Sequence, residues 1–487
     1  MNAGTGQTQS IPAGMPQIAR TATLTAVILT TLTAFLSAAG PLTAQPPATP
    51  PPLDLATLFE SGHLLLDENG DGVPDRLGAA LVFAPDPTDA ERAAAAEISA
   101  RLGFETMALD LPLRRGPQPG RIGILIGHRA VEAEGLAVAD FLPDPPLAPD
   151  PGDDPGAAHA PTVATLTTPS GDRWLAVLGD GDADLLRAAR FLAGSLPHIR
   201  SLSGPSLADV GDELSTWLAA GDSTAPAPTI TFPRIAMGPP GEGAHLFADL
   251  VFDPESIDDP AATLATQALD RLQLLGWERL GDDATGPDSA DLRFPALATV
   301  TVASGARRVM LPTLAASGSE GSAGSRPGTG AKDDLDLSNL YTNEGFLGGG
   351  DIPDRVDVLV VPGRGAEGIP ELTARMGLEA TGLTVPIVKT PDEIEAAARE
   401  PTTVLIGHDH PLIAELADSG KVAPEELPAG HGLIEIVPEA FGSKPSLVVT
   451  GADREGATNA TRRLAEVFPF VGRREDGMPT FDDIEYE

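Results

Sequence analysis

Short apolar runs alternate with longer amphipathic stretches along much of this chain. "AALVFAP", "RIGILIG" and "RWLAVLG" are nearly continuous apolar runs that end in Pro or Gly, as buried parallel strands do. Between the first two lies "TDAERAAAAEISARLG", a predicted helix that Thr88 or Asp89 caps and Gly103 ends. "DADLLRAARFLAGSL" predicts a second helix. This alternation predicts a parallel sheet flanked by helices, with right-handed crossovers.

The same succession of patterns occurs twice. Four blocks recur in order at a nearly constant offset: 53–83 with 335–361, 100–113 with 374–387, 122–128 with 402–408, and 175–199 with 447–471. Such self-similarity indicates two homologous units, which we name the first unit (53–204) and the second unit (335–475). The predicted fold class is therefore α/β, with tandem duplicated small α/β sandwich domains around a middle domain.

The remaining segments are predicted from their composition. Residues 205–314 contain strand-like runs and one amphipathic helix, which indicates a middle α/β or α+β domain. Residues 315–334 are rich in Gly and Ser and predict a flexible linker. Residues 476–487 form an acidic tail, so the chain is expected to be part of a longer system or to work beside a partner.

The N-terminus carries a predicted export signal. Arg20 precedes the uncharged, mostly apolar run "TATLTAVILTTLTAFLSAAG", and small residues follow up to Ala44. This order predicts a signal peptide over 1–44, with a stiff Pro-rich spacer over 45–52. The apolar run is also long enough to be an uncleaved membrane anchor. We expect a secreted, periplasmic or cell-surface protein that is not inserted in a membrane after signal cleavage.

Charge narrows the range of partners. The net charge is -38, with 70 acidic residues against 32 Lys and Arg. Such a balance argues against nucleic acid and anionic membrane surfaces as partners. The chain has no cysteine, which excludes disulfides, thiolate nucleophiles and Cys-ligated zinc.

The stretch "LLLDENGDGVPDRL" (64–77) has the alternating acids, amide and glycine of a calcium loop. The expected ligands are Asp67, Asn69, Asp71, the carbonyl of Val73, and Asp75. The motif resembles the loops of thrombospondin type 3 repeats and dockerins, although Gly78 stands where a bidentate carboxylate is expected. The alternative is an Asx-rich turn without metal. In the second unit the loop has shrunk to "GGGDIPD", so calcium would brace the entrance of the first unit only.

A few polar residues are candidates for binding at strand ends. His128 and His408 end equivalent "LIGH" strands, and Asp409 and His410 follow the second one. Because ligands bind outside the carboxyl ends of parallel strands, these side chains could hold a metal or act as a base, or merely cap the strand. Asp453 precedes a helix, where an anion-binding turn and an acidic N-cap are the two alternatives.

The segment 401–469 resembles the non-catalytic N-terminal α/β domain of exported glycoside hydrolases of the alpha-glucuronidase and beta-hexosaminidase type. The positions that carry the resemblance are Gly407, Gly432, Gly451, Asp453, Gly456, Ala460 and Leu464. In those enzymes the catalytic residues lie in a following barrel, which this chain lacks, so the resemblance implies an accessory fold and no catalytic positions.

These observations favour an exported, non-catalytic binding or accessory protein of the cell envelope, braced by calcium, with a carbohydrate or an envelope protein as partner. Two alternatives remain open. One is a hydrolase with its site in the cleft between the duplicated domains. The other is a structural or adhesive envelope protein.

Overall fold

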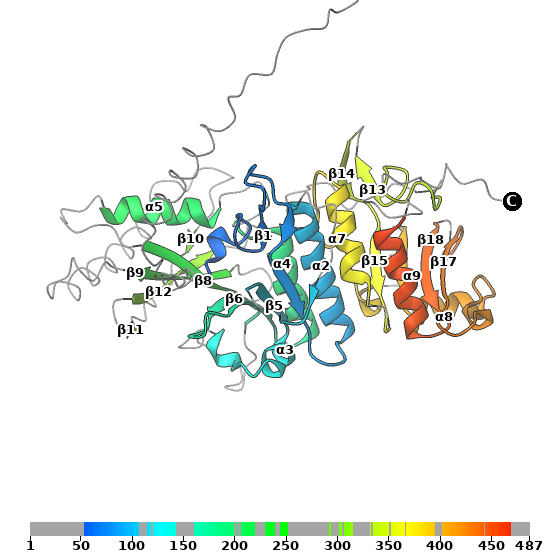
Figure 1. Ribbon diagram of the computed structural model, residues 1–487, viewed down its shortest axis with the longest axis horizontal. Coiled ribbons are helices and arrows are strands. Elements are labelled where there is room, and N and C mark those ends of the chain that lie inside the picture. Colours follow the sequence, from blue (N-terminus) through cyan, green and yellow to red (C-terminus); the bar gives the residue numbers. More distant parts are fainter. Residues whose placement is uncertain are drawn as a thin grey trace, which may run out of the picture. The chain divides into compact units, whose positions relative to one another are not determined.

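The computed structural model describes most of the chain between Leu53 and Phe468 (Figure 1). The described residues are 53–106, 114–117, 120–142, 160–198, 202, 206–219, 229–238, 244–251, 292–293, 301–303, 306–314, 332, 335–349, 352–365, 367–394, 402–442 and 444–468. The predicted signal peptide, the spacer, the acidic tail and, except for Lys332, the predicted linker lie outside these residues.

The first unit is built on a sheet whose strands follow the predicted apolar runs. They are β3 (Ala79–Val82), β4 (Arg114–Arg115), β5 (Ile122–Ile126), β6 (Thr162–Thr167) and β7 (Arg173–Leu178). Strands β4, β3, β5 and β7 are parallel neighbours in that order, and β6 pairs antiparallel with β7. The mixed α/β class that the sequence predicts is confirmed.

Helices cover both faces of this sheet. α2 (Asp89–Glu105) and α4 (Asp182–Gly194) share a core with alternate strand residues, and α3 (His128–Ala133) packs on the opposite face. The predicted start of α2 is confirmed, because the Thr88 hydroxyl accepts a hydrogen bond from the backbone N–H of Glu91 at 3.1 Å. The predicted stop at Gly103 is wrong: α2 continues to Glu105, and Gly103 lies in a helix–helix contact.

The sheet does not end at the predicted boundary between residues 204 and 205. After α5 (Leu207–Ala219), β8 (Thr229–Met237) pairs antiparallel with β6. The sheet then continues through β9 (Ala244–Val251) and β12 (Ala306–Leu314) to the short strands β10 (Leu292–Arg293) and β11 (Thr301–Ala303). The described strands of the predicted middle domain therefore extend the sheet of the first unit.

The second unit has its own four-stranded sheet. Its strands are β15 (Leu359–Pro362), β16 (Thr403–Ile406), β17 (Gly432–Val437) and β18 (Ser446–Gly451), and its helices are α7 (Ile369–Glu379), α8 (Pro411–Asp418) and α9 (Arg454–Glu466). Strands β15, β16 and β18 are parallel, and β17 pairs antiparallel with β18. The strand order β15-β16-β18-β17 has the same directions as β3-β5-β7-β6 of the first unit.

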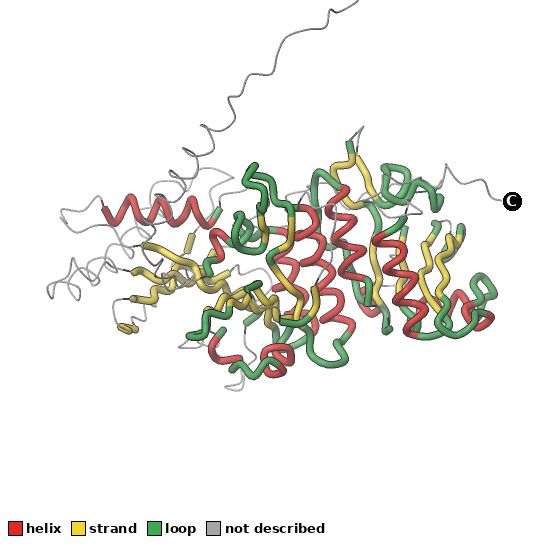
Figure 2. The backbone as a smooth tube through the Cα atoms, viewed as in Figure 1, coloured by secondary structure: helices red, strands yellow, loops and turns green. Residues whose placement is uncertain are grey.

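The two units meet through helices, which lie between the two sheets in Figure 2. α2 packs on α7 at two glycines that approach backbone atoms of the other helix. A Cβ on Gly103 would lie 1.8 Å from the carbonyl oxygen of Ala374, and one on Gly377 would lie 2.0 Å from that of Ala100. The contact is thus reciprocal, and only glycine fits at either position.

One buried arginine on each helix supports this contact in the same way. Arg101 Nε donates to Glu105 at 2.6 Å, Nη1 donates to the carbonyl of Ala193 at 3.1 Å, and the guanidinium lies 4.2 Å from the centroid of the Phe59 ring. In the second unit, Arg375 makes the equivalent contacts with Glu379 (2.5 Å), Ala465 (3.2 Å) and the Tyr341 ring (4.2 Å). Each arginine ties its helix to the end of the neighbouring helix.

Short elements precede each unit. The helix η1 (Leu55–Thr57) and the hairpin β1 (Leu65–Leu66)–β2 (Arg76–Leu77) precede β3, and the hairpin β13 (Leu347–Gly349)–β14 (Pro353–Val356) precedes β15. The short helices η2 (Val138–Asp140), η4 (Pro391–Glu393) and η6 (Pro424–Glu426) lie in loops. None of the helices in the described ranges is long and apolar enough to span a membrane.

Candidate functional site

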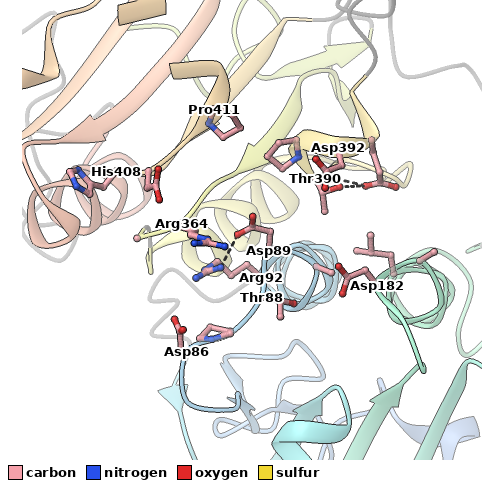
Figure 3. A pocket seen from close by; sticks show the side chains of 18 of the residues that line it. Asp86, Thr88, Asp89, Arg92, Asp182, Arg364, Thr390, Asp392, His408 and Pro411 are labelled. Atoms are coloured by element: carbon pink, nitrogen blue, oxygen red, sulfur yellow. Dashed lines mark hydrogen bonds and ion pairs between the residues drawn. The ribbon is translucent and has the colours of Figure 1, made fainter. Parts of the chain in front are cut away.

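A polar cleft of about 850 Å³ lies between the two units, at the carboxyl ends of their parallel strands (Figure 3). Its walls come from the N-terminal ends of α2 and α4 in the first unit, and from the loops after β15 and β16 and the start of α9 in the second. We name it the inter-unit cleft. Strand ends of this kind are where ligands bind in open α/β sheets.

Arginines and acids of the inter-unit cleft are largely paired with each other. Arg92, almost fully buried, has its Nη1 2.9 Å from the Asp89 carboxylate. At the start of α9, the exposed Arg454 has its Nη2 2.9 Å from Glu367. The side chain of Arg364 is exposed and lies beside Arg92 and Asp89 in Figure 3. The lining thus combines paired arginines with further acidic side chains, so both signs of charge face the cleft.

The histidines predicted at the strand ends lie in different places. His408 lines the inter-unit cleft, and its Nδ1 is 3.0 Å from the carbonyl oxygen of Gly451. His410, two residues on, is buried and caps α8: its Nδ1 accepts from the N–H of Leu412, so its Nε2–H donates to the carbonyl of Val361 at 3.1 Å. Burial lowers the pKa of His410 to about 4, which keeps the ring neutral.

His128 belongs to the first unit and does not line the inter-unit cleft. It begins α3, with its Nδ1 3.6 Å from the Asp180 carboxylate. Within the described ranges, no three His, Asp or Glu side chains gather closely enough to hold a metal ion. The convergence of His408, His410 and an acid that would support the hydrolase alternative is not found among these residues.

The two acids of the second unit have structural contacts. Asp453 caps α9, its carboxylate accepting from the N–H of Gly456 and from the N–H of Gly430, each at 2.8 Å. These bonds, that to Gly456 first, lower the pKa of Asp453. The exposed Asp409 lines the inter-unit cleft and pairs its backbone with that of Arg364. Asp453 therefore acts as an acidic N-cap, the second of the two alternatives.

The calcium-like loop connects β1 to β2 and is closed by its own side chains. Asp67 accepts from the N–H of Gly70 at 2.6 Å and of Gly72 at 2.8 Å, and these bonds, that to Gly72 first, lower the pKa of Asp67. Asp75 accepts from the N–H of Glu68 at 2.8 Å and from the side-chain amide of Asn69 at 3.1 Å. A cation would have to share these oxygens with the loop N–H groups.

Asp71 and Val73 complete this loop. The Asp71 carboxylate accepts from the N–H of Val73 at 2.8 Å, and the side-chain oxygen of Asn69 accepts from the N–H of Asp71 at 2.8 Å. Val73 is 42% exposed. Asp67, Asn69, Asp71 and Asp75 are thus held in one loop as hard oxygen donors, which calcium prefers, but with fewer ligands than the six to eight that calcium takes.

A buried ionic cluster between the units was missed by the sequence reasoning. Glu97 of α2 is fully buried and accepts from the N–H of Ile387 at 3.3 Å and of Val388 at 3.1 Å. Arg190 of α4 lies 3.5 Å from Glu97 and 2.9 Å from Glu393. Burial raises the pKa of Glu97 to about 7, despite Arg190. A charged residue inside the run "AAAAEISA" was the available signal, because that stretch is otherwise apolar.

Comparison with known protein families places the chain in a family context. The family model described as the S-layer like family, outer domain, matches residues 88–468. The match begins at the residue that caps α2 and ends at the last described residue, so it covers the first unit from Thr88 onward, the strands between the units and the second unit up to Phe468, and it leaves out β1, β2 and β3. No curated protein matches this chain.

Proposed function

The chain belongs to the S-layer like family, and from this membership we propose that it is a structural protein of the cell surface that assembles with copies of itself into a layer. The observation that carries the proposal is the extent of the family match, which covers residues 88–468 and so includes most of the first unit and every described residue of the second unit. A cell-envelope protein is what the sequence predicted, and the structural alternative is the one that this family supports.

The candidate site is consistent with a structural role. Two arginines of the inter-unit cleft, Arg92 and Arg454, form ion pairs with neighbouring acids, and His410 uses both ring nitrogens in local hydrogen bonds. The buried contacts at α2 and α7 hold the two units together by glycine packing and by Glu97 and Arg190. Groups committed in this way stabilise an architecture, and none of them is poised at a reacting atom.

Three further points complete the proposal. Residues 1–44 act as the export signal. The two units arose by duplication, an inference supported by their shared strand order and by the equivalent contacts of Arg101 and Arg375. The loop from Asp67 to Asp75 binds calcium weakly and so braces the β1–β2 hairpin: its oxygens are of the right type but few, and calcium would have to draw the three carboxylates closer together than they lie in this structure.

The test of the proposed function is made on cells that produce the protein. Antibodies against the purified chain should label intact cells, and envelope fractions should show a periodic array by negative-stain electron microscopy. Deletion of the gene should remove the array or change its lattice. A chain that fractionates with the cytoplasm, or an array that is unchanged in the deletion strain, would refute the proposal.

A further inference from the structure

The strand β17 is an edge strand that the described part of the chain leaves unpaired on its outer side. Its sequence, "GLIEIV", contains one charge and no proline. Leu433, Ile434 and Ile436 are only partly buried, and the two isoleucines pack against the core that faces α7 and α9. Natural edge strands are normally protected by charged side chains, especially lysine, by proline, by bulges or by a covering segment. β17 has a single charged residue, Glu435, and no lysine, proline or bulge.

In the first unit, the strand at the equivalent edge is paired with a further antiparallel strand. β6 occupies the same place in its sheet as β17, and it is covered by β8 in antiparallel pairing, with Thr162, Val163 and Ala164 opposite Ala236, Ile235 and Arg234. As a result the first four residues of β6 are buried, whereas the first five of β17 are exposed or half-exposed. The same edge is thus closed in one unit and open in the other.

The opposite edge of the second unit's sheet, strand β15, is covered by another segment of the chain. The N–H of Val360 in β15 donates to the carbonyl of Ile387 at 2.9 Å, and the N–H of Lys389 donates to the carbonyl of Val360 at 3.0 Å. The segment around Val388 therefore covers β15. This leaves β17 as the edge at which the described sheet can grow.

The backbone groups that point outward from β17 follow from its register. The N–H of Ala452 donates to the carbonyl of His431 at 3.0 Å, which places these two residues at hydrogen-bonded positions of the ladder. Bonded and non-bonded positions then alternate along an antiparallel pair of strands. Gly432, Ile434 and Ile436 consequently direct their N–H and C=O groups away from β18. In agreement, the carbonyl of Val449, opposite Ile434, accepts from Gly407 on the other side of β18.

We propose that β17 pairs with β17 of a second copy of this chain, antiparallel and about a two-fold axis, so that the two sheets become continuous. The proposal rests on the proposed function, because it names one of the contacts by which the layer would assemble. In the register centred on Ile434, the Ile434 residues of the two copies face each other and each Glu435 faces Leu433 of the other copy, so no two carboxylates are directly opposed. The partner strand carries the same outward N–H and C=O groups, as an isologous contact requires.

Two edge variants test the pairing in the full chain. Ile434→Pro removes an outward N–H and takes no hydrogen bond from β18, since Ile434 is not in a bonded pair with Val449. Its matched control is Ile434→Val, which keeps the N–H. Glu435→Lys adds the charge that natural edges use, and its control is Glu425→Lys, at an exposed position of η6.

Sedimentation over a dilution series should show self-association of the wild-type chain and of both controls. Ile434→Pro and Glu435→Lys should weaken it at least tenfold while far-UV circular dichroism and thermal melts show a folded chain. If both edge variants associate as the wild type does, or if the wild type stays monomeric, the proposed pairing is refuted. The proposed function fails separately, on cell-surface labelling and the array.

Amide hydrogen exchange shows whether β17 is covered by a second copy of the chain or by another segment of the same chain. In the dilute monomer, the amides of Gly432, Ile434 and Ile436 should exchange quickly and those of Leu433, Glu435 and Val437 slowly. On assembly the first three should become protected. Protection of all six amides already in the monomer would mean that another part of the same chain covers β17, and this result would overturn the proposal.

Discussion

The first unit and the second unit share strand order, strand direction and helix contacts, but they differ at one edge of the sheet. In the first unit β6 is covered by β8 and the strands beyond it, while in the second unit β17 ends the described sheet. A second difference lies at the entrance, where a loop rich in acids joins β1 to β2 and a much shorter turn joins β13 to β14. The two units therefore share the features that hold them together, which are the strand order and the helix contacts. They differ at their exposed parts, which are one sheet edge and the entrance hairpin.

The largest loss of stability is expected from substitutions at the reciprocal glycine contact between α2 and α7, which both units share. Gly103→Ala would place a Cβ against the backbone of Ala374, and Gly377→Ala would place one against the backbone of Ala100. Because these backbone atoms cannot move aside, each substitution should destabilise the protein by about 3 kcal/mol. Gly211→Ala in α5 is the control, because the new Cβ meets Phe232 at an ordinary 3.4 Å. There the better helix propensity of alanine should stabilise by up to about 1 kcal/mol. Urea unfolding measures all three; a neutral Gly103→Ala would contradict the close approach.

A matched pair of variants tests whether the two buried arginines contribute equally to stability. Arg101→Met and Arg375→Met each leave a buried helix-end carbonyl, that of Ala193 or Ala465, without its donor. Each should cost about 2 kcal/mol, and the two costs should agree closely. Chemical denaturation supplies both values. Strongly unequal costs would show that the two arginines have different roles.

Glu97 provides a comparison that depends on pH. Its pKa in the folded state is raised to about 7, so the folded protein binds more protons than the unfolded chain between about pH 4.5 and pH 7. The stability that Glu97 contributes is therefore fully present below pH 4.5 and is lost as the pH rises through 7. Wild type should lose about 3 kcal/mol relative to Glu97→Gln between pH 4.5 and pH 8. Thermal melts of both proteins from pH 4.5 to pH 8 measure the difference, and parallel curves would exclude the raised pKa.

Calcium should stabilise the β1–β2 hairpin of the first unit but not the β13–β14 hairpin of the second. This is the smallest of the four expected changes in stability. Millimolar calcium should stabilise the wild-type chain by about 1 kcal/mol relative to EDTA, because it binds the folded loop only. Asp71→Ala should abolish this gain, since it removes one of the carboxylates of the loop. Melting temperatures report the shift. An equal shift in Asp71→Ala would place any calcium effect elsewhere in the protein.

The sequence predicted the candidate site less well than the fold. Thr88 was recognised as a cap because capping chemistry is local, and the apolar strands were recognised because burial on both faces needs continuous apolar runs. Gly103 was read as a helix stop, since glycine is common there, whereas its reason is a contact with a helix far along the chain. His128 and His408 share the "LIGH" pattern, yet His408 lines the inter-unit cleft and His128 does not, and the neighbouring His410 is buried.

The sequence by itself determined the α/β class, the positions of β3, β5, β7, α2 and α4, and the acidic, cysteine-free character of the chain, because each of these depends on composition or on periodicity over a few residues. Tertiary structure alone decided that β8 would join β6 while β17 would stay at an edge, that α2 would meet α7 through glycines, and that Glu97 would be buried beside Arg190. Those outcomes depend on which distant surfaces come together, and no local pattern of side chains encodes that choice.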